Sequence, residues 1–363
     1  MDLLAVLQVL AGLALLVVGG EVLVRGASAL AVRAGISPLV VGLTVVSVAT
    51  SAPELAVTTG AVFSGESELA LGNVVGSNIA NILLILGVSA LVLPIGIRRQ
   101  LVRVDVPFLI GFSLLLLVLV LDGDISAWDG LILLGAWLGH TGMSVWLSKR
   151  GDPPPVDEAE VNTDSSLPMS LLLVIGGVGL LVGGAQLLVA GAVSIAIGLG
   201  ISSLVVGLTV VAIGTSMPEL VASVIAVKRN AGDLAVGNAV GSCLANIGLV
   251  LGVPALLKPG GLPVPSAVVS VDLPLMIAAA VALLPVVYTG GRIARREGGL
   301  FLALYVSYTC YVVLDASGHD SQEGFSGVMV ALVLPLVGLT LLVLSGRERQ
   351  KRRRAKRAPT LNE

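Results

Sequence analysis

Residues 38–87 read PLVVGLTVVSVATSAPELAVTTGAVFSGESELALGNVVGSNIANILLILG, and residues 203–252 repeat this block without a gap. The two copies are identical at 28 of 50 positions, at a constant offset of 165 residues. Even in a chain rich in Leu, Val, Ala and Gly, we expect chance identity at only about one position in ten, so the block is an internal duplication.

The similarity between the two halves extends beyond this block. Residues 104–107 (VDVP) correspond to residues 271–274 (VDLP), and each repeat is predicted to contain five helices. Because five is an odd number, the second copy must enter a membrane from the side opposite to the first. This inverted arrangement is typical of secondary transporters, whose substrates bind near the membrane midplane where the two copies meet.

The composition of the chain predicts a membrane protein. Hydrophobic residues make up 56% of the sequence, charged residues only 12%, and the mean hydropathy is +1.02. A soluble core of this length cannot bury so much apolar surface. A membrane helix needs about 20 apolar residues, and eleven such spans are predicted, approximately at residues 3–31, 38–62, 69–94, 104–121, 127–148, 168–197, 203–227, 234–257, 269–290, 299–315 and 325–345.

We therefore expect an all-α polytopic membrane protein, in which two inverted five-helix repeats form a ten-helix core and an eleventh transmembrane helix follows. The predicted parts are a first repeat at 1–148, a flexible acidic cytoplasmic loop at 149–167, a second repeat at 168–315, and an extra helix with a basic tail at 316–363. No separate soluble domain is expected. The first span is interpreted as a retained helix and not as a signal peptide, because no basic region precedes it.

The basic residues predict the orientation of the chain. Lys and Arg collect in alternate loops and in the tail, so that 19 of the 21 fall on one side of the predicted membrane. By the positive-inside rule this side is cytoplasmic, which places the amino terminus outside and the carboxyl terminus inside a cytoplasmic (inner) membrane. The basic tail is interpreted as an anchor that touches anionic lipid, and not as a nucleic-acid site. No obligate protein partner is inferred.

Each repeat contains a helix interruption directly before an acidic residue. Residues 49–54 read ATSAPE, and residues 214–219 read GTSMPE. Proline supplies no N–H group and clashes with the carbonyl four residues back, so it frees backbone carbonyls at the break. In a membrane such carbonyls are tolerated where they line a polar cavity or bind a cation.

Glu54 and Glu219 are therefore acidic side chains near the middle of predicted spans. A charge at this depth costs several kcal/mol unless it is paired or solvated. No Lys or Arg lies at a comparable depth in the repeats, so a bound cation or a proton is the expected partner. The alternative is a pair of protonated glutamates that are hydrogen-bonded for structural reasons.

The next helix of each repeat carries a polar stripe. Residues 72–81 read GNVVGSNIAN and residues 237–246 read GNAVGSCLAN. Asn73, Ser77 and Asn81 recur every four residues and share one helical face. Such stripes also join helices to one another without binding an ion. Beside the glutamates, we interpret them as cation ligands.

All of these candidate ligands are oxygen atoms, which suits Ca²⁺ and Na⁺. The chain lacks the sets of Cys and His that zinc or copper prefers. Cys243 and Cys310 are interpreted as packing residues within spans, and His140 and His319 as solitary residues at helix ends or in loops. No cofactor is expected.

The duplicated motif TSxPE followed by GNxxGSxxxN resembles the alpha repeats of the cation/Ca²⁺ antiporter superfamily, in its sodium/calcium exchanger branch of prokaryotic antiporters. The resemblance implies that Ca²⁺ is coordinated by Glu54, Glu219 and the carbonyls of Thr50 and Thr215. It implies sodium sites at Ser51, Ser77, Ser216 and Ser242, at carbonyls near Ser47 and Ala212, and at the shared carboxylates, with Asn81 and Asn246 completing the central site. Ala49 replaces a glycine that is usual in the family. Asn246 stands where some relatives have aspartate, which leaves the coupling ion open.

The expected function is therefore exchange of Na⁺ for Ca²⁺ by alternating access at a midplane site shared by both repeats, with the first and sixth helices moving against the core. A Ca²⁺/H⁺ antiporter is the nearest alternative, since glutamates can also carry protons. A cation channel is less favoured, because a pore usually needs oligomeric rings of ligands. An enzyme is disfavoured, because Glu54 and Glu219 lack a nucleophile or a metal-ligand partner of the usual kinds.

Overall fold

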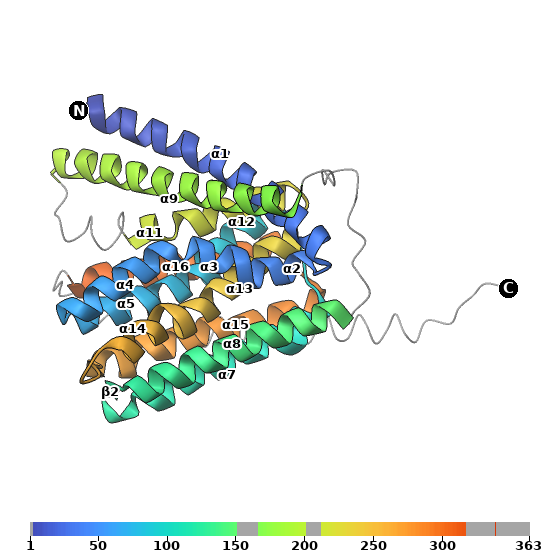
Figure 1. Cartoon of the computed structure of the whole chain (residues 1–363). Helices are drawn as coiled ribbons and strands as arrows, with labels where there is room; N and C mark the ends of the chain where they lie inside the picture. Colours follow the sequence, from blue (N-terminus) through green and yellow to red (C-terminus); the bar gives the residue numbers. More distant parts are fainter. Residues whose placement is uncertain (1–2, 151–165, 201–211, 317–337, 339–363) are drawn as a thin grey trace.

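The computed structural model describes residues 3–150, 166–200, 212–316 and 338, and within them the chain is almost wholly helical, with its long helices running along one axis (Figure 1). The first half contains α1 (Leu3–Ala34), α2 (Pro38–Val41), η1 (Gly42–Val46), α3 (Ser47–Thr50), α4 (Ala52–Ser64), α5 (Ser67–Ile79), η2 (Ala80–Ile85), α6 (Leu86–Val92), η3 (Leu101–Asp105), α7 (Val106–Leu119), η4 (Val120–Asp122) and α8 (Ala127–Arg150). The second half contains α9 (Leu167–Gly198), α11 (Ala212–Thr215), α12 (Met217–Lys228), α13 (Gly232–Ala245), η6 (Asn246–Leu251), α14 (Gly252–Leu257), η7 (Val268–Asp272), α15 (Leu273–Gly290) and α16 (Arg295–Ala316).

The described helices agree with nine of the eleven predicted spans. Eight of them are long and apolar enough to cross a membrane, and the bent pair Pro38–Thr50 and Ala52–Ser64 makes a ninth. The predicted span at 203–227 begins outside the described residues, and α11 and α12 are its described part. The predicted eleventh span at 325–345 lies outside the described residues apart from residue 338. The all-α membrane fold is confirmed, and the eleventh helix stays a prediction.

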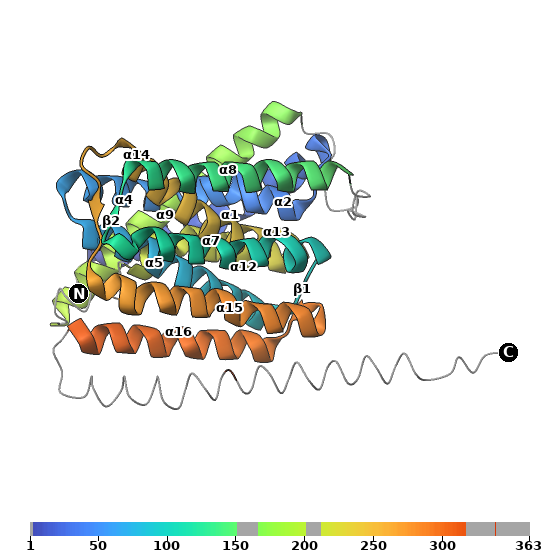
Figure 2. The ribbon, with the colours of Figure 1, turned by 90° about the horizontal axis from the view of Figure 1, so that it is seen from below.

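Four two-residue strands connect the two halves crosswise. β1 (Ile95–Gly96) pairs with β4 (Arg292–Ile293), and β2 (Asp124–Ile125) pairs with β3 (Leu262–Pro263), both antiparallel. In each pair, a strand from the first half meets a strand from the second half. β1 and β2 lie at opposite ends of the helix bundle (Figure 2). The first strands of the two halves, β1 and β3, thus lie at opposite ends of the bundle, and so do the second strands, β2 and β4, an arrangement that fits the predicted inverted repeat.

The helices α1 and α9 pack side by side and antiparallel through glycine (Figure 1). The contact residues recur every seven positions and match at the repeat offset: Gly12, Gly19 and Gly26 on α1, and Gly177, Gly184 and Gly191 on α9. A Cβ atom on Gly177 would lie 2.5 Å from the backbone nitrogen of Leu23, and one on Gly12 would lie 2.7 Å from the carbonyl oxygen of Gly184. Only glycine permits two helix backbones to approach so closely.

The centre of the bundle is formed by the second helix region of each block. Within the apolar windows of Ser67–Val92 and Gly232–Leu257, 83% and 78% of the residues are buried, compared with 28% for α1, α8 and α9. The helices α5 and α13 therefore lie inside the protein, and α1, α8 and α9 present broad apolar faces to lipid. The buried polar side chains of these helices, such as Ser77, Asn78, Asn238 and Ser242, face protein and not hydrocarbon.

Candidate ion-binding site

Each half contains a broken helix at its TSxPE motif. Ser51 (φ −80°, ψ 10°) separates α3 from α4, and Ser216 (φ −89°, ψ 7°) separates α11 from α12. Pro53 and Pro218 follow at the second helical position, where a missing N–H group is tolerated. The first break bends the helix by 49°. Both interruptions that the sequence predicted are thus present at the expected residues.

The two glutamates lie directly after these breaks. Glu54 is in the first turn of α4, Glu219 is in the first turn of α12, and each is only 1% exposed. The Glu219 carboxylate lies close enough to Glu54 for the two charges to repel each other, and it also lies near Thr50 and Ser51 of the first half. The amino-terminal ends of the two half-helices favour negative charge at these positions. The structure therefore brings together the two acidic residues from separate halves.

Two asparagines from the polar stripes hold the broken helices in place. The Asn73 side-chain amide donates to the carbonyl oxygen of Glu54 at 3.2 Å and to the Thr58 hydroxyl at 2.9 Å. Asn238 repeats this pattern, because its amide donates to the carbonyl oxygen of Glu219 at 3.3 Å and to a serine hydroxyl at 3.0 Å. Their hydrogen bonds fix the backbone that presents the glutamates.

A cross-repeat hydrogen bond joins the two breaks. The Thr50 hydroxyl donates to the side-chain oxygen of Asn238 at 3.2 Å, and Thr50 is fully buried. The first break is therefore positioned by the helix that also positions Glu219. The geometry of one carboxylate depends on the other half of the protein.

Asn81 and Asn246 lie in π-helical segments that occupy equivalent places in the two halves, η2 and η6. A π-helical turn carries one more residue than an α-helical turn, and such turns are frequent at functional sites. Asn246 donates to the side-chain oxygen of Asn78 at 3.1 Å, and the Cys243 thiol donates to the carbonyl oxygen of Asn78 at 3.6 Å. Sequence reasoning did not select Asn78. The only signal was that the residue at the equivalent position, Cys243, is different.

The buried oxygen atoms without a hydrogen-bond partner gather at these residues. Seven of the ten such oxygens in the described residues are the Ser51 Oγ, Glu54 Oε2, Asn81 Oδ1, Glu219 Oε1 and Oε2, Ser242 Oγ and Asn246 Oδ1, and the other three belong to Ser67, Ser89 and Asp105. Each of the six residues that carry the seven oxygens is one that the sequence selected as a ligand, and each is at most 2% exposed. Burying a polar atom without a partner costs about 1–3 kcal/mol, and more for a charged group. A cation among these oxygens would remove that cost, and no Lys or Arg in the described residues forms an ion pair with either glutamate.

The remaining predicted ligands lie around the same breaks. Ser47 is fully buried, its hydroxyl donates to the Leu43 carbonyl at 2.9 Å, and its own carbonyl accepts the N–H of Ser51. Ser77 is buried within α5, and Ser216 is buried at the break between α11 and α12. Ala212 begins the four-residue helix α11, and Thr215 ends it.

One prediction away from this site is wrong. His140 was expected at a helix end or in a loop, but it lies within α8 and is 4% exposed. Its Nε2 atom is 3.1 Å from Asp105, which also accepts a hydrogen bond from Ser144 at 3.3 Å, and Phe108 stacks on the imidazole ring. Asp105 lies in η3, 35 residues away in the sequence, and Phe108 lies in α7, so no local pattern indicated these partners. His319 lies outside the described residues.

Membrane helices in two related halves that meet at a buried, oxygen-rich site define a secondary transporter of ions. The family model described as "Sodium/calcium exchanger protein" matches residues 4–146 and 169–314. The chain therefore belongs to the sodium/calcium exchanger family and is a cation antiporter of the membrane.

Known relatives match over most of their length. The chain is 36% identical to "Inner membrane protein YrbG" of Escherichia coli, over 71% of this chain and 81% of that protein. It is 30% identical to "Sodium/calcium exchanger MaX1" of Methanosarcina acetivorans, over 83% of this chain and 96% of that protein. A solved structure of the sodium-calcium exchanger NCX_Mj, soaked with 10 mM Na⁺ and zero Ca²⁺, matches with a TM-score of 0.73 at 34% identity, over 84% of this chain and 98% of that chain.

Proposed function

We propose that this protein exchanges Na⁺ for Ca²⁺ across the cytoplasmic membrane, at a single site that Glu54 and Glu219 share. The observation that carries the proposal is the set of buried, unpartnered oxygen atoms contributed by both halves. Two carboxylates balance the charge of one Ca²⁺. Hydroxyl and amide oxygens supply neutral ligands, which suit both Ca²⁺ and Na⁺. The family membership supports these two ions as substrates.

Exchange follows from competition for the same carboxylates. When Ca²⁺ leaves, the repulsion between Glu54 and Glu219 is relieved only if other cations take its place. An empty site keeps two buried charges uncompensated and is unfavourable in the membrane interior. The empty protein therefore crosses between its two access states slowly, while a protein loaded with either Ca²⁺ or Na⁺ crosses readily. This coupling prevents a net leak of Ca²⁺.

The ligands proposed for the two ions overlap. Glu54, Glu219 and the carbonyls of Thr50 and Thr215 hold Ca²⁺, and the serines Ser51, Ser77, Ser216 and Ser242, with carbonyls near Ser47 and Ala212, hold Na⁺. Asn81 and Asn246 complete the central site. We further propose that the pair α1 and α9 moves against the core to expose the site alternately to the two sides, with the amino terminus outside and the carboxyl terminus in the cytoplasm.

The coupling ion is tested by ⁴⁵Ca²⁺ uptake into vesicles that contain the purified protein. An outward Na⁺ gradient at equal pH is expected to drive uptake, and a pH gradient without Na⁺ is expected to drive none. The unpartnered hydroxyls of Ser51 and Ser242 support Na⁺, because a proton needs no ring of neutral oxygens. Uptake that follows the pH gradient and ignores Na⁺ would replace the proposal with Ca²⁺/H⁺ exchange.

A further inference from the structure

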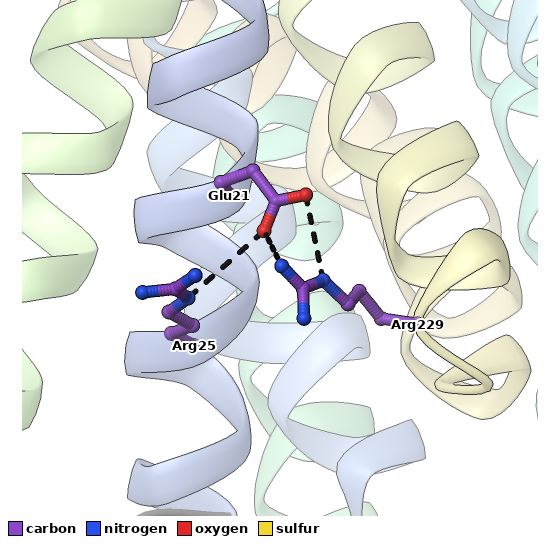
Figure 3. Close-up of polar contacts among 3 residues, drawn as sticks. All are labelled: Glu21, Arg25 and Arg229. Atoms are coloured by element: carbon purple, nitrogen blue, oxygen red, sulfur yellow. Dashed lines mark hydrogen bonds and ion pairs between the residues drawn. The ribbon is translucent and has the colours of Figure 1, made fainter. Parts of the chain in front are cut away.

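An ion pair joins α1 to the end of the helix that carries Glu219. Arg229 follows α12 directly, and its Nη2 atom is 2.5 Å from the Glu21 Oε2 atom, while its Nε atom is 3.4 Å from Oε1 (Figure 3). The guanidinium group thus donates to both oxygens of the carboxylate, and this bidentate geometry is the strongest for such a pair. Arg25, one turn along α1, approaches Glu21 only to 3.9 Å and is 68% exposed.

The pair connects two parts of the protein that have different roles. α1 packs against α9 through the glycine contacts described above, and Glu21 lies two residues after the contact residue Gly19. α12 carries Glu219 in its first turn, at the ion site, and ends one residue before Arg229. A movement of the α1 and α9 pair along the core must therefore stretch or break the bond between Glu21 and Arg229.

The pair joins the first half to the second, and the duplication does not supply charged residues at the symmetry-related positions. At the repeat offset of 165, the position equivalent to Glu21 is Gln186, and the position equivalent to Arg229 is Ser64. Both are uncharged. In an inverted-repeat transporter, the two access states are related by exchanging the conformations of the two halves. The contact between Glu21 of the first half and Arg229 of the second half has no symmetry-related counterpart in the exchanged state, so it changes the free-energy difference between the two states.

We infer that the Glu21–Arg229 pair is a latch that favours the access state seen here over the opposite-facing state. The latch acts through the position of α1 relative to α12 and not through ion binding, because neither side chain belongs to the site. The inference rests on the proposed alternating movement of α1 and α9, but it does not depend on whether Na⁺ or H⁺ is the coupling ion.

The population of the two states is measured as a distance distribution between spin labels, without any ion gradient. One label replaces Val32 at the end of α1, and the other replaces Met143 on α8, which packs against α14 and η6; both positions are exposed. Cys310 is replaced by Ser, whereas Cys243 is only 1% exposed and stays. Glu21→Gln and Arg229→Gln are each expected to shift the ratio of the two populations by roughly two- to fivefold away from the state described here.

Two further variants separate the latch from a general effect of charge. The double variant Glu21→Arg/Arg229→Glu is expected to restore the wild-type ratio, and Arg25→Gln is expected to leave it unchanged. Building the missing counterpart with Gln186→Glu and Ser64→Arg is expected to shift the ratio in the same direction as breaking the latch, because the new pair stabilises the opposite state.

An unchanged ratio in Glu21→Gln and Arg229→Gln, or an equal shift in Arg25→Gln, overturns the inference. If the ratio shifts as expected but vesicle uptake ignores Na⁺, the latch stands and the proposed coupling ion fails.

Discussion

At the scale of single residues, the site depends on charge at Glu54 and Glu219. Both carboxylates are buried, and Glu54 Oε2 and both carboxylate oxygens of Glu219 lack hydrogen-bond partners in the described residues. An amide has nearly the same shape as a carboxylate but no charge, so it cannot balance a divalent cation. The backbone around each glutamate is held by Asn73 and Asn238 through its carbonyl oxygen, which the substitution leaves in place.

Glu54→Gln and Glu219→Gln are therefore each expected to abolish Ca²⁺ uptake into vesicles, while expression and the thermal unfolding temperature stay close to the wild type. Glu68→Gln, at an exposed position in the first turn of α5, is the matched control and is expected to transport normally. Near-normal uptake by both site variants would show that the ion binds elsewhere.

The amides Asn81 and Asn246 predict which monovalent ions take part. With two carboxylates and two amides, the site holds just enough negative charge to balance one Ca²⁺. There is little electrostatic reason to recruit K⁺ in addition. Uptake of Ca²⁺ driven by an outward Na⁺ gradient is thus expected to proceed in K⁺-free buffer at the rate seen with K⁺. Uptake that fails without K⁺ and recovers on its addition would contradict this account of the charge.

At the scale of helices, α9 carries two adjacent glycines at the contact with α1. Gly177 lies against the α1 backbone, and Gly176 lies in open space. A Cβ atom on Gly177 would lie 2.5 Å from the Leu23 backbone, whereas one on Gly176 would meet nothing within 4 Å. Gly177→Ala is expected to push the helices apart, to lower the unfolding temperature by several degrees and to slow exchange. Gly176→Ala is expected to be neutral or slightly stabilising, because Ala is the better helix former. Equal effects of the two substitutions on the unfolding temperature and on uptake would contradict the claim that α1 and α9 need glycine at their contact.

The sequence predicted the helices, the breaks and the pairing of Glu54 with Glu219, because duplication and proline leave a direct trace in the residues. It did not predict that Asn73 and Asn238 hold the backbone, since their partners are set by the packing of two helices. The π-helical segments were also missed, because one extra residue in a turn scarcely alters a fully apolar pattern. The strand pairs are two residues long and carry no alternating pattern. The ligand roles of the site residues stay a proposal.

At the scale of the whole molecule, the distribution of Lys and Arg predicts one orientation. With 19 of 21 basic residues on one side, a reporter fused after Glu363 is expected to be cytoplasmic, and a tag before Met1 is expected to be accessible from outside. The fusion protein must retain Ca²⁺ uptake for the result to apply to the native fold. An external carboxyl terminus would overturn both the orientation and the count of eleven spans.

The central claim is that one carboxylate from each half binds the ion that is exchanged. Equilibrium binding of ⁴⁵Ca²⁺ to the purified protein, titrated with Na⁺, tests it without any transport step. We expect Na⁺ to displace bound Ca²⁺ from the wild-type protein and from Glu68→Gln. Neither Glu54→Gln nor Glu219→Gln is expected to bind Ca²⁺ with comparable affinity. Binding of Ca²⁺ that withstands Na⁺, or that survives in both glutamate variants, would contradict the claim.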